Sequence, residues 1–327
     1  MTTEVAGSVD ELLEGATDVT PIVSVGKSGA RLDRVTIGGE PHVVKYLDPD
    51  VDWTMRASGV DGSPTVELWR RGLLARLPAC INQPIIAVAE EDGVTVLLMR
   101  DVGEWLVPAT DDVVPLDQHL RFLDHMAVMH ATFWQTPDDV DLVSNRTRYL
   151  ELSPQTAERE EALGSTHPVP PLIGRGWPLL AEVAPTAAAI VAPLAADPTR
   201  LVDALRGTPE TFIHGNWKFD NLGTDEQQRT VLFDWELPGR APPLSDLAWY
   251  LAINCRRLPH SKEDAISAYR SALERQGVDT GPWWSHQLAL CLLGALVQFG
   301  WEKAFSGYDD ELVWWERRAV EAEHLLA

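Results

Sequence analysis

The sequence changes character near residue 101, where short β-rich runs give way to long stretches with helical spacing of apolar residues. Before this point, runs rich in β-branched and aromatic residues, bounded by Gly, Pro and Asp, predict strands. The predicted strands span residues 21–25, 32–37, 41–46, 84–89 and 94–99. A helix predicted over 65–77 follows the third strand and ends before Pro78. This order predicts an α+β fold, with a β-rich N-terminal lobe before a mostly helical C-terminal lobe.

After residue 101, apolar residues recur every three or four positions, which is the period of an amphipathic helix. The predicted helices span residues 116–134, 179–194, 198–205, 246–253, 262–276, 284–301 and 311–326. Residues 136–176 are polar and contain several prolines, so we expect an irregular insertion there. We therefore expect one lobe over residues 1–102, with a hinge at about 97–102, and a second lobe over residues 103–327.

The charge of the chain restricts its partners. Acidic residues outnumber basic ones by 49 to 27 among 327 residues, which gives a formal charge of -22. Such a charge repels phosphate backbones, so we expect no nucleic-acid partner. It would attract a cationic small molecule, although an acid-rich, well-solvated surface explains the same charge without any ligand.

The sequence predicts neither secretion nor a membrane partner. No Lys or Arg precedes Lys27, so no signal peptide is expected. The longest uninterrupted apolar run, 288–297, is too short to span a bilayer. Cys80, Cys255 and Cys291 are too few and too far apart for a disulfide framework. We therefore expect a soluble, cytoplasmic protein.

A specific motif occupies residues 214–221, which read HGNWKFDN, and a second motif, DWE, occupies residues 234–236. In kinase-type catalytic loops, an Asp accepts the proton of the substrate hydroxyl, and a later Asn binds Mg²⁺. A further Asp, at the end of the next strand, binds Mg²⁺ that bridges the phosphates. In this chain Asn221 and Asp234 stand at the two metal-binding positions, and Asn216 stands where the catalytic Asp belongs.

These motifs resemble those of the aminoglycoside phosphotransferase family, whose pattern is H-G-D-x-x-x-x-N, then D-[WF]-E, then D-L-A. Residues 246–248 match the third motif, and residues 129–134, MHATFW, are similar to a helix common in such proteins. The resemblance implies a two-lobed protein-kinase-like fold that transfers the γ-phosphate of ATP (or GTP), with Mg²⁺, to a hydroxyl of a small molecule. The family acts on aminoglycosides, other antibiotics, choline, homoserine and sugars, so antibiotic resistance is one role that the resemblance implies.

The resemblance also implies roles for residues around the catalytic loop. Asn216 occupies the catalytic position, Lys218 reaches the transferred phosphate, and His214 supports the loop. Asp246 supports the same loop by hydrogen bonding to its backbone. The candidates for contact with the acceptor are Asp220, Glu236 and Trp301. For Trp301, packing in the core is the alternative interpretation.

The resemblance places the nucleotide in the N-terminal lobe. Lys45 matches the strand lysine that binds the α- and β-phosphates, and Glu67 is its expected ion-pair partner. An ordinary exposed helix acid is the alternative interpretation of Glu67. Residues 97–102 resemble the hinge that holds adenine, and we expect Met99 and Asp101 to contribute there.

A glycine-containing turn over residues 26–31 is expected to cover the phosphates through Ser28 and Gly29. Its sequence Gly-Lys-Ser ends like a Walker A loop, which requires another glycine five residues before Gly26. That position is Pro21, so the Walker interpretation is excluded.

Asn216 raises the question of whether the reaction still occurs. An amide resembles a carboxylate in size, but it carries no negative charge and is not a useful base. It is consistent with an inactivating substitution, with a pseudoenzyme that binds nucleotide or ligand, or with a subfamily whose base lies elsewhere. Because Lys45, Lys218, Asn221 and Asp234 are all present, long relaxation of selection is disfavoured. A protein-directed regulatory kinase is also disfavoured, because no A-P-E motif follows Asp234.

Overall fold

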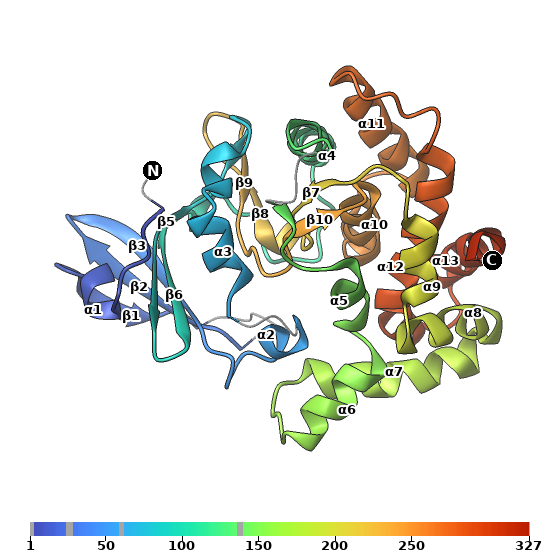
Figure 1. The fold of residues 1–327 in the computed structure, drawn as a ribbon, viewed down its shortest axis with the longest axis horizontal. Helices are drawn as coiled ribbons and strands as arrows, with labels where there is room; N and C mark the ends of the chain where they lie inside the picture. The colour runs from blue at the N-terminus through green and yellow to red at the C-terminus, as the bar shows by residue number, and fades with distance from the viewer. Residues whose placement is uncertain (1–2, 24–28, 59–61, 136–139, 327) are drawn as a thin grey trace.

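The computed structural model describes residues 3–23, 29–58, 62–135 and 140–326. Within them, an antiparallel β-sheet forms one end of the molecule and helices form the other (Figure 1). The described strands of this sheet follow the order β1-β2-β3-β6-β5. Their bounds are β1 Thr17–Pro21, β2 Arg31–Ile37, β3 Glu40–Leu47, β5 Ile85–Glu91 and β6 Val94–Arg100. The predicted α+β fold with two lobes is confirmed.

Two tight hairpins set the register of the sheet. Gly38 and Gly39 join β2 to β3 with φ of 61° and 85°. Asp92 and Gly93 join β5 to β6 with φ of 50° and 83°. Two-residue hairpin turns favour positive φ at both positions, because this backbone twist matches that of the flanking strands.

The two faces of the sheet have different partners. Val44 lies on the face that packs against α1 (Val9–Leu12). Because side chains alternate along a strand, Lys45 lies on the opposite face, across from Leu97 of β6. The main hydrophobic core covers this second face and continues through α3 (Pro64–Arg70) into the helical lobe. Lys45 therefore points toward the boundary between the lobes.

The N-terminal lobe departs from the sequence prediction in several places, beginning with α1, which was not predicted. β1 ends at Pro21, whereas the first strand was predicted over 21–25, part of which lies outside the described residues. The helix predicted over 65–77 ends at Arg70, and a 3₁₀ turn, η1 (Leu73–Arg76), follows Gly72. Gly72 adopts φ of 64°, a left-handed conformation that ends a helix. A further short helix, α2 (Trp53–Ser58), was not predicted.

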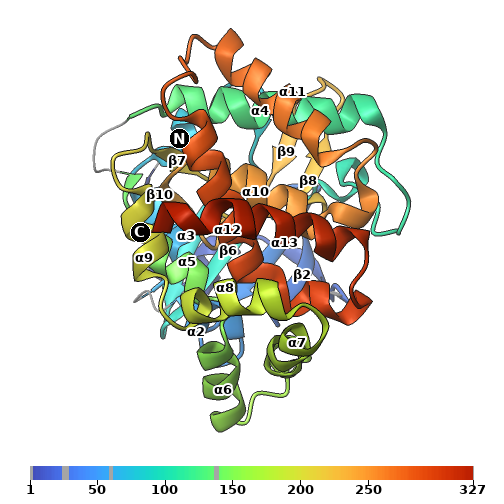
Figure 2. The ribbon, with the colours of Figure 1, turned by 90° about the vertical axis from the view of Figure 1, so that its right-hand side faces the viewer.

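The helical lobe is built around α12 (Trp284–Lys303), most of whose side chains are buried. Helices α7, α8, α10 and α13 pack against it (Figure 2). The other helices of the lobe are α4 Leu116–Thr132, α5 Asn145–Leu150, α6 Pro154–Ala162, α7 Val169–Val183, α8 Pro185–Ala196, α9 Thr199–Leu205, α10 Leu244–Ile253, α11 Lys262–Arg275 and α13 Asp310–Glu323. Single 3₁₀ turns are η2 Gly103–Trp105, η4 Phe219–Asn221, η5 Cys255–Arg257, η6 Ala304–Ser306 and η7 His324–Leu326.

The stretch Trp284–Ser306 is long and apolar enough to cross a membrane, but 78% of its most apolar window is buried inside the fold. This stretch is longer than the uninterrupted apolar run at 288–297 noted in the sequence, because the helix continues through polar residues on both sides of that run. Such burial is typical of the central helix of a soluble protein.

The other described strands are short and lie outside the five-stranded sheet. Their bounds are β4 Ile81–Asn82, β7 Thr211–Ile213, β8 Leu222–Thr224, β9 Thr230–Leu232 and β10 Gly239–Ala241. β4 belongs to the segment before the expected hinge, yet it pairs in parallel with β9 of the helical lobe. The strand that leads to the DWE motif is therefore fixed to both parts of the chain.

The predicted irregular insertion at 136–176 is wrong for the part that the structure describes. Helices α5 and α6 and the first half of α7 occupy it. Ser144 and Ser153 cap α5 and α6 by accepting hydrogen bonds from backbone N–H groups of their first turns. Proline is tolerated in the first turn of a helix, where the backbone N–H group has no partner within the helix. Pro154 of α6 and Pro170 of α7 therefore lie in first turns and do not break these helices. The helix predicted over 179–194 is also divided, because α7 ends at Val183 and α8 begins at Pro185.

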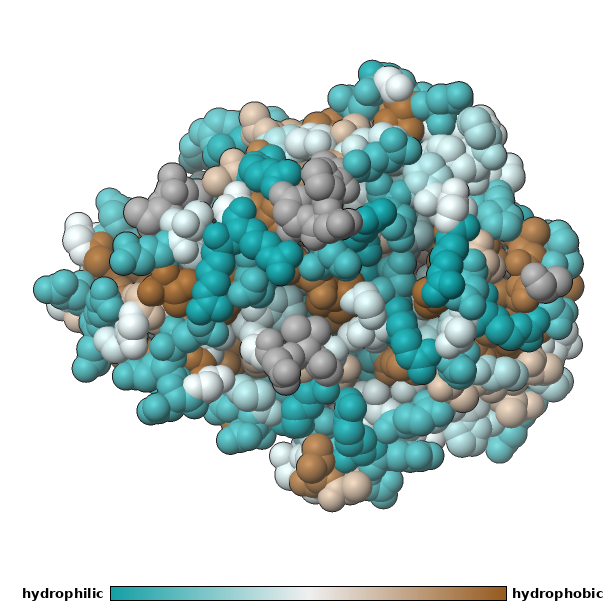
Figure 3. Space-filling model, in the orientation of Figure 1, coloured by the Kyte–Doolittle hydropathy of each residue, from teal (hydrophilic) through white to brown (hydrophobic). Residues whose placement is uncertain are grey.

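One face of the molecule is mostly hydrophilic. On the face shown in Figure 3, hydrophilic side chains predominate and apolar ones are scattered between them. Scattered apolar side chains are normal on a soluble protein and do not by themselves indicate an interface.

Candidate active site

The loop that carries Asn216 is held by a buried carboxylate. Both oxygens of Asp246, at the start of α10, accept hydrogen bonds from backbone N–H groups, 2.8 Å from His214 N and 2.8 Å from Gly215 N. His130 of α4 lies 3.2 Å from the same carboxylate. Burial alone would raise the pKa of Asp246, but the hydrogen bond from His130 and the nearby N–H groups outweigh burial and lower it. Asp246 therefore remains charged inside the protein.

Gly215 is required by the path of this loop. Its φ of 78° is in the left-handed region, and a Cβ atom at this position would lie 2.1 Å from the carbonyl oxygen of Leu237. Glycine alone avoids both problems. Its lack of a side chain allows the loop to pack directly against the segment that follows the DWE motif.

His214 joins the loop to the end of the strand before Asp234. Its Nδ1 accepts a hydrogen bond from Asn216 N at 3.2 Å, and its Nε2 lies 3.0 Å from the carbonyl oxygen of Phe233. A carbonyl only accepts, so Nε2 carries the proton and the ring is neutral. Burial lowers the pKa of His214 to about 4, which agrees with this neutral form.

Asn216 itself is buried, with 5% of its surface exposed. Its Nδ2 lies 3.5 Å from Oδ2 of Asp234, and its Oδ1 is buried without a hydrogen-bond partner among the described residues. The backbone carbonyl of Asn216 accepts a hydrogen bond from Nδ2 of Asn221 at 3.0 Å. Asn216, Asn221 and Asp234, which sequence reasoning assigned to one site, thus lie together.

Asp234 has an unusual backbone conformation, with φ of 70°. Left-handed conformations are uncommon for residues other than glycine, and they often occur at functional turns. The turn is braced from the other lobe, because Thr65 of α3 donates a hydrogen bond of 2.7 Å to the carbonyl of Trp235.

Lys45 of β3 reaches across to this turn. Its Nζ forms ion pairs with Asp234 and, at 2.9 Å, with Glu236. Burial opposes the charge on Lys45, but the two carboxylates outweigh burial and raise the pKa of its ammonium group above its usual value. Burial and the charge of Asp234 raise the pKa of Glu236 to about 8, whereas Lys45 and Lys218 hold the pKa of Asp234 below its usual range against the effect of burial. Asp234 is therefore the stronger acid of this pair and keeps its charge over the wider pH range.

The expected ion pair between Lys45 and Glu67 does not occur in the structure. The Glu67 side chain is 41% exposed and forms ion pairs with Arg70 at 3.2 Å and Arg71 at 3.3 Å, within α3 and just after it. The helix turns Glu67 toward solvent, and the carboxylates of the DWE turn occupy the position next to Lys45. Glu67 is thus placed as an ordinary helix acid.

Lys218 and Asp220 lie on the outer part of the loop. Lys218 is half-buried and makes no hydrogen bond or ion pair with any residue that the structure describes, although its charge acts on Asp234 and His214. Asp220 is exposed. Lys218 is thus a cation whose ammonium group is available to a ligand.

The other predicted nucleotide residues lie along the sheet. Met99 is buried in β6, across from Val43. Asp101 follows β6, where its carboxylate pairs with Arg34 at 2.8 Å and accepts from Gly103 N at 3.0 Å. Gly29 adopts φ of 96°, whereas Ser28 lies outside the described residues.

Trp301 lies away from this group of residues. It is buried in the core of the helical lobe, where its ring contacts Phe305 of η6 with centroids 6.3 Å apart. Its backbone carbonyl packs closely over Gly176 of α7.

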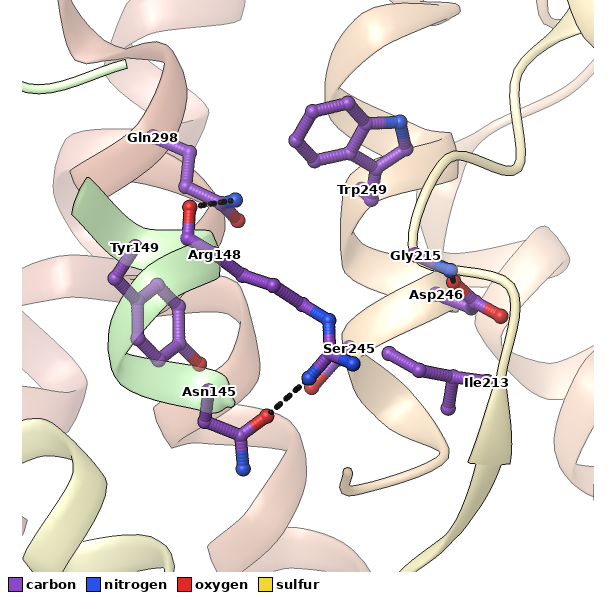
Figure 4. Close-up of a pocket in the computed structure, with 9 residues that line it drawn as sticks. All are labelled: Asn145, Arg148, Tyr149, Ile213, Gly215, Ser245, Asp246, Trp249 and Gln298. Atoms are coloured by element: carbon purple, nitrogen blue, oxygen red, sulfur yellow. Dashed lines mark hydrogen bonds between the residues drawn. The ribbon is translucent and has the colours of Figure 1, made fainter. Parts of the chain in front are cut away.

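Two residues of α5 and its C-terminal end were missed by sequence reasoning. Arg148 is buried and donates from Nε to the carbonyl of Leu237 at 2.9 Å. In Figure 4 its side chain extends from α5 toward Ser245 and Asp246 at the start of α10, beside the loop that carries Gly215. Glu151, one turn later, is buried near Lys218 and Asp234, whose charges act on it. Both residues belong to the stretch predicted to be irregular, so no periodic signal identified them.

Comparison with known proteins agrees with this geometry. A model of the phosphotransferase enzyme family matches residues 67–279, more than half of the chain. The chain therefore belongs to this family, and it is a kinase-like phosphotransferase. No curated protein sequence matches it at a significant level.

Solved structures share the fold at low sequence identity. Aminoglycoside phosphotransferase APH(4)-Ia is similar with a TM-score of 0.51 and 12% identity, over 98% of this chain and 97% of that one. A thermostable mutant of that enzyme, in ternary complex with AMP-PNP and hygromycin B, has a TM-score of 0.51 and 14% identity, over 98% and 97% of the two chains. Choline kinase LicA from Streptococcus pneumoniae has a TM-score of 0.50 and 14% identity, over 97% and 96%. At these identities the likeness establishes the fold.

Proposed function

We propose that this protein transfers the γ-phosphate of ATP (or GTP), with Mg²⁺, to a hydroxyl of a small molecule. The observation that carries the proposal is the ion pair between Lys45 and Asp234, residues from different lobes, beside Asn216 and Asn221. A lysine, a carboxylate and an amide gathered at one cleft are the groups that kinase-type phosphoryl transfer requires for phosphate and metal binding.

The nucleotide would occupy the boundary of the lobes, with residues 1–102 as the nucleotide-binding lobe. Met99 and Asp101, in the hinge at 97–102, and Gly29 would contact it, and Lys45 would bind its phosphates. A structural neighbour in complex with AMP-PNP supports nucleotide binding by this fold.

The residues present fit a magnesium ion. Nδ2 of Asn221 is used by the carbonyl of Asn216, which leaves Oδ1 of Asn221 without a hydrogen bond among the described residues. Asp234 supplies a charged carboxylate beside it. Mg²⁺ prefers such oxygen ligands, and when bound it would neutralise charge on the transferred phosphate.

The acceptor would approach over Asn216 and Lys218, and Lys218 would bind the phosphate as it is transferred. Named neighbours are a choline kinase and an enzyme in complex with hygromycin B, both of which support a small-molecule acceptor. The formal charge of -22 favours a cationic one, such as an aminoglycoside antibiotic or an amino alcohol. Asp220 and Glu236 are the residues proposed to contact it, whereas Trp301, the third candidate, packs in the core. A soluble, cytoplasmic protein agrees with these substrates.

The test combines nucleotide binding with turnover. MgATP at 100 times its Kd should stabilise the purified protein by about 2.7 kcal/mol, and a Lys45→Met variant should lose this effect. ADP release should then be screened with aminoglycosides, choline, homoserine and sugars, for the natural chain and for Asn216→Asp. An absence of both stabilisation and ADP release in Asn216→Asp would overturn the proposal.

Asn216 favours a second function, that of a pseudokinase which binds nucleotide without transferring phosphate. An amide does not accept the proton of a hydroxyl, and the buried Oδ1 of Asn216 has no partner among the described residues. This alternative predicts stabilisation by MgATP, with no ADP release above background from either the natural chain or Asn216→Asp.

A further inference from the structure

Glu151 is a buried carboxylate without a bonding partner. It lies just after α5 with 6% of its surface exposed, and its Oε2 is fully buried. No hydrogen bond or ion pair joins its carboxylate to any residue of the described parts of the chain. Burial of a charged group without such partners costs free energy, so a fold that keeps one often uses it at a functional site.

The position of Glu151 is fixed by the residue one turn earlier. Arg148 donates to the carbonyl of Leu237 at 2.9 Å and to Oδ1 of Asn145 at 2.9 Å (the latter shown in Figure 4). Since Leu237 directly follows the DWE turn and packs against Gly215, α5 is attached to the catalytic loop and the DWE turn together. Glu151 is therefore carried by a rigid element, as precise chemistry requires.

The charges of four residues act on Glu151. Burial raises the pKa of its carboxyl to about 7, Asp52 of the loop before α2 and Asp234 add to this effect, and Lys218 and Arg148 oppose it. Glu151 therefore lies near enough to Lys218 of the catalytic loop and Asp234 of the DWE turn for their charges to act on it. A carboxyl group that titrates near neutral pH is well matched to accepting and releasing a proton.

The other carboxylates around the cleft are engaged. Asp234 and Glu236 form ion pairs with Lys45. Oδ1 of Asp52 accepts hydrogen bonds from the backbone N–H and the hydroxyl of Thr54. Among the buried carboxylates that the described residues place here, Glu151 is the one with neither oxygen in use.

We propose that Glu151 accepts the proton of the acceptor hydroxyl, in place of Asn216. The inference rests on the proposed function and adds its missing base. The O–H bond breaks as its proton passes to the Glu151 carboxylate, and the hydroxyl oxygen forms a bond to the γ-phosphorus. The bond from that phosphorus to the bridging oxygen breaks, and its electron pair leaves with ADP.

The test is a double-mutant cycle on ADP release from MgATP. The acceptor is the compound of the ADP-release screen that gives the highest rate. If no compound raises the rate above that with water alone, water is the acceptor. Glu151→Gln should lower kcat on the order of 10²-fold with little change in KM, because it keeps the shape and removes the base. In the Asn216→Asp background, Glu151→Gln should lower kcat by no more than about threefold, since the aspartate introduced at position 216 then supplies a second base. Glu158→Gln, an exposed carboxylate of α6, is the matched control and should leave kcat unchanged.

A second readout is independent of turnover. Carbon-13 NMR of protein labelled at glutamate carboxyls should show a resonance that titrates near pH 7 and is missing from Glu151→Gln, whereas the resonance of Glu236, with a pKa of about 8, should remain. A Glu151 carboxyl that titrates near its ordinary value would overturn the inference.

Three kinetic results would also overturn the inference about Glu151. An equal loss of kcat in both backgrounds, or a rise in KM alone, would assign Glu151 to structure or to acceptor binding and overturn the inference. An active natural chain whose kcat is unaffected by Glu151→Gln would do the same. If MgATP is neither bound nor turned over by any variant, the proposed function has failed, and this inference fails with it.

Discussion

Glu151→Gln should stabilise the protein in a pH-dependent way, because the natural side chain is a buried acid. The folded protein holds the pKa of this carboxyl at about 7, against an ordinary value of 4.5. The folded state therefore binds the proton more tightly than the unfolded state does. Stability is lost as pH rises from about 4.5 to about 7, and the full loss is present above that range.

The size of the effect follows from this difference. One pKa unit corresponds to about 1.36 kcal/mol, so the ionised carboxylate costs ~3 kcal/mol at pH 8. Glutamine has nearly the same shape and cannot ionise. We expect Glu151→Gln to match the natural chain at pH 4.5 within roughly 1 kcal/mol and to exceed its stability by ~3 kcal/mol at pH 8.

Urea denaturation followed by tryptophan fluorescence measures this difference at each pH. Because the natural chain and the variant share every other titrating group, subtracting their unfolding free energies isolates Glu151. Glu158→Gln, exposed on α6, should give a difference near zero at both pH values. A constant difference between pH 4.5 and pH 8, or a less stable variant at pH 8, would refute the reasoning.

Three other substitutions test interactions buried in the helical lobe. Gly215→Ala should lower the free energy of unfolding by roughly 2–4 kcal/mol in urea denaturation, because the new Cβ meets the Leu237 carbonyl. Gly164 has a similar φ and no neighbour within 4 Å, so Gly164→Ala should lose only the free energy that a left-handed backbone costs alanine. Asp246→Asn should cost roughly 2–4 kcal/mol in the same assay, since an amide NH₂ cannot accept from the backbone N–H groups that the carboxylate serves. His119 of α4 is buried away from solvent, with its imidazole 2.6 Å from the hydroxyl of Tyr250 and 2.7 Å from Nε2 of His260. Burial and the charge of His260 lower the pKa of His119 from 6.5 to about 4, so the free energy of unfolding should fall as pH drops through this range; His119→Gln should flatten this decline, and an unchanged slope would contradict the assignment.

Much of the architecture follows from local sequence. The hairpins at Gly38-Gly39 and Asp92-Gly93 have the turn chemistry that fixes their register, and α4, α11 and α12 lie close to their predicted bounds. Helix α5 was missed because it is short, and α6 because its Pro154 was interpreted as a breaker. Whether a proline begins a helix or ends it depends on the capping residue before it, such as Ser153, and that contact is visible only after folding.

The candidate site divides in the same way. The loop 214–221 and the DWE turn have fixed spacing and could be located from sequence, but the partner of Lys45 could not. Asp234 lies 189 positions from Lys45, and the contact depends on how two lobes meet. Glu151 belongs to no motif, because its role would come from burial and from neighbours supplied by the loop before α2, the catalytic loop and the DWE turn.

The ion pair between Lys45 and Asp234 has a thermodynamic consequence for how ligands enter. Magnesium and the lysine ammonium group would compete for one carboxylate, so free metal must displace a cation that is already in place. A nucleotide changes this competition, because its phosphates would give Lys45 an alternative anion and release Asp234 to the metal. Binding of metal and nucleotide should then be positively coupled, and by linkage each must strengthen the other by the same factor. The protein would take up the preformed complex of nucleotide and metal in preference to either alone.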